Sequence, residues 1–327
     1  MLVRNNRIVS VGARGEVPAG ARVIDVTGKT LIPGFIDTHY HAQWLVPEIH
    51  PGQAWQYLTN LSFGVTTTRD PQTASTDILS YADRVEVGGM VGPRIYSTGP
   101  GVSSSENVRN LEHARNILKR YAEYYDTKTL KMYIGGNRQQ RQWILMAARE
   151  QQIMPTTEGA LDTRYDMTMA IDGYPGQEHS IPVFPFYKDV VALFAQTQIA
   201  YTPTLLVSYN GPFGENYWYA TENPYGDPKL RRFTPYEELA GKSRRRVRGQ
   251  FGGGNAAGWY APDEHIFDEI AKGATDIVRA GGRVGVGSHG QLQGLGYHWE
   301  MWSLAMGGMT PMEVLRAATL HGAEAIG

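Results

Sequence analysis

Two histidines one residue apart, His39 and His41, end an apolar run that begins at Leu31. Alternate side chains of a β-strand point to the same face, so both imidazoles lie on one side of the strand. Two imidazoles on one face can bind a divalent metal ion. Because the chain contains no cysteine, the remaining ligands of such a site must be histidine, carboxylate or a modified lysine. The spacing therefore predicts a metal site at the end of a strand.

The elements that would position these histidines are short apolar runs that alternate with amphipathic stretches. Eight runs have the character of strands, at residues 32–38, 64–70, 94–98, 129–133, 153–158, 176–179, 199–203 and 283–288. Helical periodicity is visible over residues 107–125, 138–151, 184–197 and 265–280. Eight such units predict an α/β fold, a (β/α)8 barrel of the TIM type. The alternative, an open doubly wound sheet, would need a glycine-rich phosphate loop after its first strand, which this sequence lacks.

Further side chains that could bind a metal stand at the carboxyl ends of the later strands. Lys131 lies in the fourth run, Glu158 ends the fifth, His179 ends the sixth and His289 follows the eighth. The carboxyl ends of barrel strands meet at one face, so we expect these side chains and the first histidine pair to form one site. The ordinary alternatives are a structural ion pair between Lys131 and Glu158, and histidines that pack in the core.

Three more residues are candidates for the surroundings of this site. His298 would add an imidazole near His289, and Tyr133 ends the fourth run as a candidate substrate contact. Asp70 ends the second run and could orient a metal-bound histidine, although capping a turn before Pro71 is its more common role. For His298 the alternative is packing under the segment that covers the site.

Two regions lie outside the repeated pattern. Residues 3–11 and 21–26 read as strands, and we expect residues 1–30 to form part of a small β-sandwich, followed by the barrel over residues 31–327. Residues 206–260 are too long for a plain connection and are rich in Tyr, Gly, Pro and Arg, with arginines at 244–246 and glycines at 252–254. They follow the seventh strand, so we expect a lid or specificity loop over the site. An oligomer contact and a disordered insert are the alternatives.

Residues 33–41, which read Pro-Gly-Phe-Ile-Asp-Thr-His-Tyr-His, resemble the signature of the metal-dependent amidohydrolase superfamily. Residues 6–12 and 23–29 resemble the β-sandwich that precedes its barrel, residues 64–70 its second strand and residues 310–319 its last barrel helix. The likeness extends over nearly the whole chain. It is greatest to the imidazolonepropionase-like and prolidase-like branch, including members fused behind a β-propeller.

The resemblance assigns roles to the matching residues. It implies that His39 and His41 bind the more buried metal ion and that His179 is a ligand from the sixth strand. It further implies that Lys131 can be carbamylated, which turns it into a carboxylate-like bridge between two ions. The metal expected from the resemblance is divalent, with zinc the first choice, as one ion or two.

At two positions this chain differs from the family. Glu158 replaces the histidine of the fifth strand, and glutamate is also a metal ligand. His289 replaces the eighth-strand aspartate that binds metal and accepts a proton from the attacking water. An imidazole can bind metal or act as a general base, because its ordinary pKa lies near neutrality. We therefore expect His289, Lys131 and Glu158 to be the catalytic residues.

The function that follows is a metal-dependent hydrolase of amide, ester or carbamate-type bonds in a small-molecule or dipeptide-like substrate, acting through metal-activated water. The aromatic residues of 206–260 favour an apolar or aromatic substrate. The alternative is a catalytically decayed amidohydrolase barrel that serves as a binding or structural protein. A third possibility is the same metal used for phosphotriester cleavage.

The charge balance bears on partners and location. With 31 basic and 32 acidic residues, the chain shows no charge footprint for nucleic acid or an anionic membrane. No signal peptide is visible, which predicts a cytoplasmic location as expressed, while the propeller-fused relatives suggest an exported parent protein. The sandwich strands that close such proteins are not seen, so unpaired edges are expected to favour a homo-oligomer.

Overall fold

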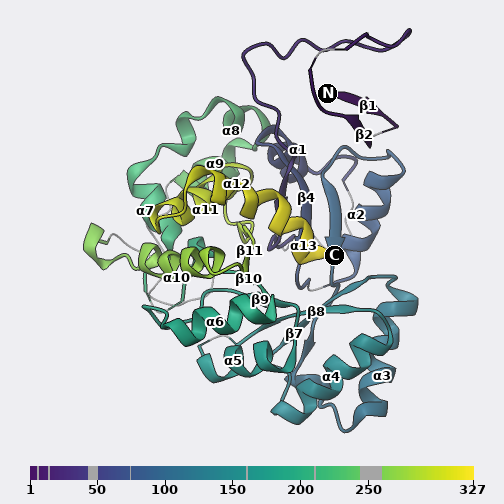
Figure 1. The fold of residues 1–327 in the computed structure, drawn as a ribbon, viewed down its shortest axis with the longest axis vertical. Helices are drawn as coiled ribbons and strands as arrows, with labels where there is room; N and C mark the ends of the chain where they lie inside the picture. Colours follow the sequence, from purple (N-terminus) through teal and green to yellow (C-terminus); the bar gives the residue numbers. More distant parts are fainter. Residues whose placement is uncertain are drawn as a thin grey trace. The chain divides into compact units, whose positions relative to one another are not determined.

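The computed structural model describes residues 1–5, 7–13, 15–42, 51–73, 75–159, 161–209, 211–243 and 260–327. The chain divides into two compact units, Met1–Pro33 and Gly34–Gly327. Figure 1 shows the course of the chain.

The first unit contains one antiparallel hairpin, in which β1 (Leu2–Arg4) pairs with β2 (Arg7–Ser10). The alternating run over residues 3–11 was expected to be a single strand, but Asn5 adopts a left-handed φ of 50° and turns the chain there. Residues 21–26 form no strand, although their composition suits one. A strand needs a neighbouring edge to satisfy its backbone, and Val23 and Ile24 are instead exposed. The β-sandwich stays a prediction.

The second unit is an α/β structure whose paired strands are all parallel. One sheet has the order β3-β4-β5, with strands Phe35–Asp37, Val65–Asp70 and Arg94–Ser97. The other has the order β11-β10-β9-β8-β7-β6, with strands Arg283–Val284, Ala200–Thr202, Gly176–Glu178, Met154–Glu158, Thr129–Tyr133 and Val102–Ser103. A strand occurs within each of the eight predicted runs, and the two-residue β6 is additional.

The two sheets meet at β3 and the chain after β11. An isolated parallel bridge joins Asp37 to Val286, and the Thr38 amide donates to the Val286 carbonyl oxygen at 2.9 Å. On the other side, the Thr127 hydroxyl donates a hydrogen bond to the carbonyl oxygen of Ser97 in β5. Among the described residues, strand pairing forms these two sheets. A backbone bridge joins them at β3, and a side-chain hydrogen bond joins them at β5.

Helices follow the strands and pack on them. They are α1 (Trp55–Ser62), α2 (Asp77–Glu86), α3 (Leu111–Lys119), α4 (Arg138–Glu150), α5 (Thr163–Asp172), α6 (Lys188–Thr197), α10 (Phe267–Arg279), α11 (Leu295–Met306), α12 (Pro311–Arg316) and α13 (Gly322–Ile326). Wider π-helical turns, Arg120–Tyr124 and Ala317–His321, extend α3 and join α12 to α13. In the segments that the structure describes, no helix is long and apolar enough to cross a membrane.

Local sequence signals explain where several helices start and end. Asn137 and Gln140 form a capping box at the start of α4, and Thr310 and Glu313 form another at the start of α12. Helix α5 ends at Gly173, whose φ of 91° is the left-handed conformation that glycine adopts without strain. These caps satisfy the backbone groups that helix ends leave unpaired.

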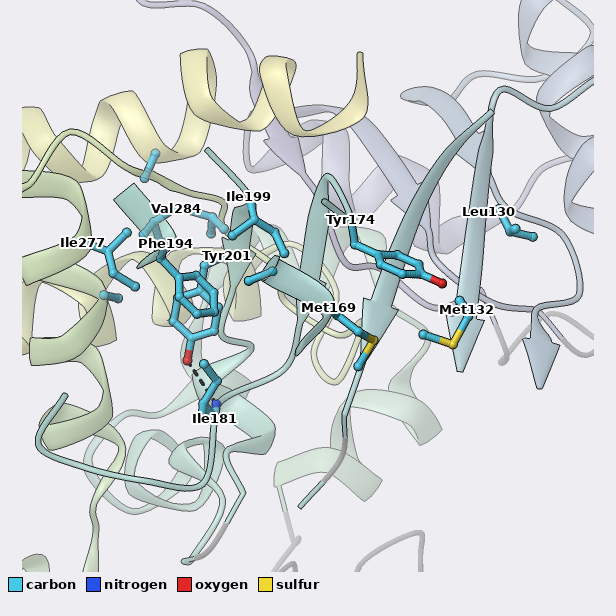
Figure 2. Packing of buried hydrophobic residues seen from close by; sticks show 14 of the residues in the cluster. Leu130, Met132, Met169, Tyr174, Ile181, Phe194, Ile199, Tyr201, Ile277 and Val284 are labelled. Carbon is cyan, nitrogen blue, oxygen red and sulfur yellow. Dashed lines mark hydrogen bonds between the residues drawn. The ribbon is translucent and has the colours of Figure 1, made fainter. Parts of the chain in front are cut away.

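The core lies between the strands and the surrounding helices. Figure 2 shows part of it, where Leu130 and Met132 of β7 and Tyr201 of β10 pack with residues of the helices. The Tyr201 hydroxyl also accepts a hydrogen bond from the Ile181 amide at 3.2 Å. Burial of these side chains removes apolar surface from water and holds the strands in place. The strand ends that carry the candidate ligands therefore stand on a packed core.

The long connection after β10 is largely helical where the structure describes it. It contains 3-10 turns at Leu205–Val207 and Pro224–Gly226 and helices α7 (Gly214–Thr221), α8 (Pro228–Phe233) and α9 (Tyr236–Ser243). A separate core cluster joins it to α1 and α11, made of Phe63, Leu206, Trp218, Leu230, Leu239, Leu292 and Trp299. The arginine and glycine runs at 244–246 and 252–254 lie outside the described residues. The segment up to residue 243 is thus a packed insertion.

Candidate metal centre

Four histidines from three strand ends lie together. His39 and His41 follow β3, His179 follows β9 and His289 follows β11. The Nε2 atoms of His39 and His41 are 3.1 Å apart, and possible ligand atoms of His39, His179 and His289 all lie within 4.8 Å of one another. Two nitrogens bound to one tetrahedral zinc ion at its usual bond length stand about 3.3 Å apart. The spacing of the first pair is therefore suitable for one ion.

In each of the four rings, Nδ1 faces a partner from the protein. The partners are Glu178 Oε2 for His39 at 2.8 Å, the Gln72 carbonyl oxygen for His41 at 3.1 Å, the Thr204 hydroxyl for His179 at 2.8 Å and Gln291 Oε1 for His289 at 3.4 Å. A neutral imidazole that donates from Nδ1 keeps its lone pair on Nε2. The acceptors opposite His39, His41 and His289 therefore favour the tautomer whose Nε2 can bind a metal, and the Thr204 hydroxyl, which can donate or accept, is compatible with the same tautomer of His179.

Burial keeps the inner histidines neutral. It is the largest cause that lowers the pKa of His39 and His289 well below the ordinary value, and neighbouring histidines lower both further. Burial likewise lowers the pKa of His179 to about 4, although Glu158 acts in the opposite direction. A neutral imidazole is the form that binds a metal ion, so these rings are ready to bind one at neutral pH.

Two of the four histidines have left-handed backbones. The φ angle is 66° at His179 and 57° at His289, a region of backbone conformation that residues other than glycine rarely occupy. At His289, the amide donates to the His39 carbonyl oxygen at 2.7 Å, which holds the turn against the end of β3. Strain of this kind occurs at functional sites, where the surrounding structure enforces it.

Asp37 ties the ends of β3 and β11 to each other. Its buried carboxylate accepts hydrogen bonds from the Ser288 amide at 3.0 Å, from the Ser288 hydroxyl and from the His39 amide at 3.2 Å. Burial raises the pKa of Asp37 to about 7, against the lowering effect of the bonds from Ser288. The carboxylate fixes the residues next to two of the histidines. Sequence reasoning missed this role, although Asp37 lies inside the motif.

Glu178 and Arg69 form a buried ion pair behind His39. The Arg69 guanidinium donates to Glu178 Oε1 and, through Nε, to the Thr38 carbonyl oxygen at 2.9 Å. Glu178 also accepts from the Thr156 hydroxyl, so its oxygens have three donors. Sequence reasoning did not assign either residue. The available signal was a charged residue in the interior of two predicted strands, because buried charges are normally paired.

Lys131 and Glu158 meet beside the histidines. Lys131 Nζ donates to Glu158 Oε2 at 2.8 Å, and His179 Nε2 lies 3.6 Å from the same oxygen. The hydroxyl of Tyr209, which comes from the insertion, donates to Glu158 Oε1, and its ring stacks on His179 at 5.0 Å between centroids. Tyr133 lies nearby, with its ring centre 5.9 Å from Lys131 Nζ.

The charge of Glu158 is set by these neighbours. Burial by itself would raise its pKa, but His179 and Lys131 outweigh burial and lower the pKa to about 2. Glu158 is therefore a carboxylate at neutral pH. The ion pair that was the ordinary alternative for Lys131 and Glu158 is present, and it lies at the site.

Of the remaining candidates, Asp70 lies at the site and His298 does not. Asp70 Oδ1 is 3.3 Å from His41 Nδ1, while Asp70 also accepts from the amides of Ala42 at 2.6 Å and Gln72 at 3.1 Å. It therefore both contacts a candidate ligand and caps the turn. His298 Nε2 donates to the Phe63 carbonyl oxygen at 2.9 Å, and its ring packs edge-on against Phe35. Its place in α11 turns the ring toward α1 and β3.

A family model described as the amidohydrolase family matches residues 30–327. The chain belongs to the amidohydrolase family. The prediction that the chain is a member of the metal-dependent amidohydrolase superfamily is confirmed. The prediction of an amidohydrolase-type enzyme is confirmed at the level of the family.

Individual relatives of this amidohydrolase are more distant. It is 28% identical over 150 residues to a 5-methylthioadenosine/S-adenosylhomocysteine deaminase of Symbiobacterium thermophilum, covering 37% of this chain and 34% of the relative. It is 23% identical over 160 residues to an imidazolonepropionase of Deinococcus radiodurans, covering 46% of this chain and 40% of the relative. These aligned regions thus span about a third to two fifths of the curated relatives.

A solved structure supports the same fold. A Xaa-Pro dipeptidase aligns over 90% of this amidohydrolase and 75% of its own chain, with a TM-score of 0.59 and 14% identity. At that identity, the likeness concerns the fold alone.

The donor set of this amidohydrolase fits a divalent metal ion. The imidazoles of His39, His179 and His289 are buried, held neutral by burial and bonded through Nδ1, which is the arrangement that metal-binding histidines adopt. His39, His179 and His289 form the group that the described part of the chain offers to an ion. His41 adds a fourth nitrogen, 3.1 Å from His39 Nε2.

Proposed function

We propose that this amidohydrolase hydrolyses an amide, ester or carbamate-type bond in a small-molecule substrate, using a divalent metal ion held by His39, His41, His179 and His289. The observation that carries the proposal is the set of Nδ1 contacts: three have acceptors that leave the lone pair on Nε2 for an ion, and the fourth, with the Thr204 hydroxyl, is compatible with the same arrangement. Zinc is the first choice, because imidazole nitrogens in a site of this size suit it. The names of the curated relatives, a deaminase and an imidazolonepropionase, support hydrolytic chemistry.

We propose in addition that the strands of the second unit close into a (β/α)8 barrel. Eight parallel strand–helix units and the bridge between Asp37 and Val286 support closure. In that arrangement the candidate ligands stand at the carboxyl ends of the strands, where active sites of such barrels lie.

When bound, the ion would polarise the scissile carbonyl and lower the pKa of a bound water. The protein's own residues would orient the ligands and move protons. Glu178 accepts a hydrogen bond from Nδ1 of His39, and Gln291 accepts one from Nδ1 of His289. The lone pair of each ring is therefore on Nε2. His289 stands at the place of the family's aspartate and is proposed as a ligand; its other expected role, general base, would require Nε2 to be free of the ion. Lys131 and Glu158 would supply hydrogen bonds and charge beside the substrate.

The insertion after β10 is proposed to form one wall of the site. Tyr209 stacks on His179, and Glu215 of α7 accepts a hydrogen bond from Gln291 Nε2 at 3.3 Å. Gln291 in turn contacts His289. An aromatic wall supports a substrate with an apolar or aromatic group.

Metal analysis tests the proposal directly. Protein purified without chelator should contain a bound divalent ion, and the double variant His39→Ala/His41→Ala should lose both the ion and hydrolysis. His113→Ala, which changes a histidine of α3, is the matched control and should keep both. A folded protein that binds no ion when zinc, manganese or cobalt is supplied would exclude this function. A protein that binds the ion but cleaves no member of an amide, ester, carbamate and phosphotriester panel would favour the binding-protein alternative, which the replacement of the aspartate by His289 supports.

We also propose a homo-oligomer. Val3, Ile8 and Val9 of the hairpin are exposed in the first unit, and apolar strand edges favour pairing with another chain. Light scattering after size exclusion should give a mass above that of one 36.3 kDa chain. A monomer at micromolar concentration would exclude it.

A further inference from the structure

The Lys131–Glu158 pair occupies the place where the resemblance implies a second metal ion. Lys131 lies in β7 and Glu158 ends the neighbouring β8, with Lys131 in register with Thr156. The lysine side chain extends from that level to reach Glu158 Oε2 at 2.8 Å. Both side chains are buried, with relative exposures of 1% and 6%. The two charges therefore neutralise each other inside the protein.

Both oxygens of Glu158 are occupied. Oε2 accepts from Lys131 and Oε1 accepts from the hydroxyl of Tyr209. The phenol is held in place, because its ring stacks on His179 and its amide donates to the Ser180 hydroxyl at 2.8 Å. A buried carboxylate with two donors, one of them cationic, is already satisfied without a metal ion.

Carbamylation of Lys131 would reverse this balance. The Lys131 ammonium would first lose one proton. The neutral amine nitrogen would then bond to the carbon of CO2 and lose a second proton, so the charge of the side chain would change from +1 to −1. Glu158 would then face a second negative charge at hydrogen-bond distance, and a buried charge without a partner is costly. Tyr209 supplies a neutral hydroxyl and cannot replace the lost cation.

The histidines also suffice for a single ion. The group of possible ligands in the described segments is His39, His179 and His289, to which His41 adds a fourth nitrogen. All four belong to one cluster, with His41 and His289 at 4.6 Å and His179 and His289 at 5.1 Å between ring centroids. A second ion would have to share these nitrogens or break the ion pair.

We propose that this chain holds one metal ion at the histidines and that Lys131 stays an ammonium paired with Glu158, with Tyr209 as the positioning residue for that pair. The inference rests on the proposed function and concerns the number of ions and the chemical state of Lys131. The ion pair stands where a bridging ligand would be.

Two measurements on the unmodified protein test it without a variant. Metal analysis after saturation with zinc and desalting should give one ion per chain, with the same value in the presence and absence of bicarbonate. Protein equilibrated with 13C-bicarbonate should show no carbamate carbon in its NMR spectrum. Two ions per chain or a carbamate resonance would overturn the inference and leave the proposed hydrolase intact. No bound ion at all would instead remove the proposed function.

Variants separate a cation from a carbamate at position 131. Lys131→Arg keeps the positive charge and cannot form the carbamate, so it should keep the bound ion. Lys131→Ala with added short-chain carboxylates should show no gain in bound metal. Lys128→Ala, at a lysine that pairs with Asp126 on the surface, is the matched control. Loss of metal in Lys131→Arg together with carboxylate rescue of metal in Lys131→Ala would show that Lys131 serves as an anionic ligand.

Discussion

The four histidines and the Lys131–Glu158 pair belong to the same centre, but their polar atoms are satisfied in different ways. Each histidine uses Nδ1 for a partner from the protein and keeps Nε2 for something else. Lys131 and Glu158 use their charges on each other, and Tyr209 takes the remaining oxygen. The comparison teaches that nearness to a metal site does not make a residue a ligand. A ligand also needs a lone pair that no other group has already taken.

The largest expected effect comes from removing one charge of the pair. Glu158→Leu leaves the Lys131 ammonium buried without its carboxylate, and breaking a buried pair in this way costs about 3–5 kcal/mol. The double variant Lys131→Met/Glu158→Leu removes both charges and should recover most of that loss. Urea unfolding of chelator-treated protein measures both. An equal loss in the single and the double variant would show that the pair is not the source of the effect.

The affinity of the histidines for a metal ion depends on the partners of their Nδ1 atoms. Glu178→Gln keeps an acceptor of similar shape for His39 but removes the charge opposite Arg69. We expect metal affinity to fall about 10–100-fold, the usual effect of removing such a partner. Competition with a fluorescent chelator measures it, and Glu324→Gln, at a glutamate that is 40% exposed, is the control. Unchanged affinity would mean that the Glu178 charge does not orient His39.

Glu300 is a useful contrast to Glu158. It is also a buried carboxyl, but the donors that it meets are backbone amides and not a cation. It accepts from Leu205 at 2.7 Å and Leu206 at 3.0 Å, and burial raises its pKa to about 8. The folded state thus holds this proton more tightly than the unfolded state. Its contribution to stability is present below about pH 4.5 and is lost as the pH rises through 8.

The measurement for Glu300 is the free energy of unfolding against pH. In the window from pH 5 to 8 the slope from this group should reach about −1.4 kcal/mol per pH unit, and Glu300→Gln should flatten it. The contribution of Glu158 to the free energy of unfolding changes with pH in the opposite direction, because its pKa is lowered. It is present above about pH 4.5 and is lost as the pH falls toward 2. Asp37, whose pKa is raised to about 7, adds a slope of the same sign below pH 7, so the test is the change in slope between the two proteins. An unchanged slope in Glu300→Gln would assign the titration to another group.

The smallest effect is expected at Thr204. Thr204→Val keeps the shape of the side chain but removes the hydroxyl that contacts His179 Nδ1 at 2.8 Å. The loss of one hydrogen bond should cost about 1 kcal/mol in stability. Metal affinity should fall by less than in Glu178→Gln, because no charge is removed. A larger loss of affinity than in Glu178→Gln would reverse the ranking of neutral and charged partners.

Much of the architecture could be predicted from local pattern. The strands formed where apolar runs of four to seven residues end in turn signals, and even the weak run at 176–179 became β9. Helix starts such as Asn137 and Thr310 were encoded by capping residues. The first unit was predicted less well, because the run over 21–26 had the composition of a strand but no edge to pair with.

Part of the candidate site was visible for a similar reason. A strand end has a fixed alternation of side chains, so His39 and His41 on one face follow from spacing alone. His298 shows the limit of that reasoning. It lies nine residues after His289 in the sequence, yet it sits in α11 and contacts Phe63 and Phe35 instead of the histidines.

By itself, the sequence determined the element pattern, the histidine pair and the residue types at the strand ends, because these depend on short-range periodicity and side-chain chemistry. Only the tertiary structure decided which group each side chain meets. Glu178 contacts His39 across 139 positions of the sequence, and Tyr209 contacts Glu158 across 51 positions, so neither contact has a local signal. Gln291 contacts His289 across only 2 positions. The state of Lys131 is the clearest case. Its type and strand position are local facts, whereas its partner depends on how two neighbouring strands and the insertion pack together.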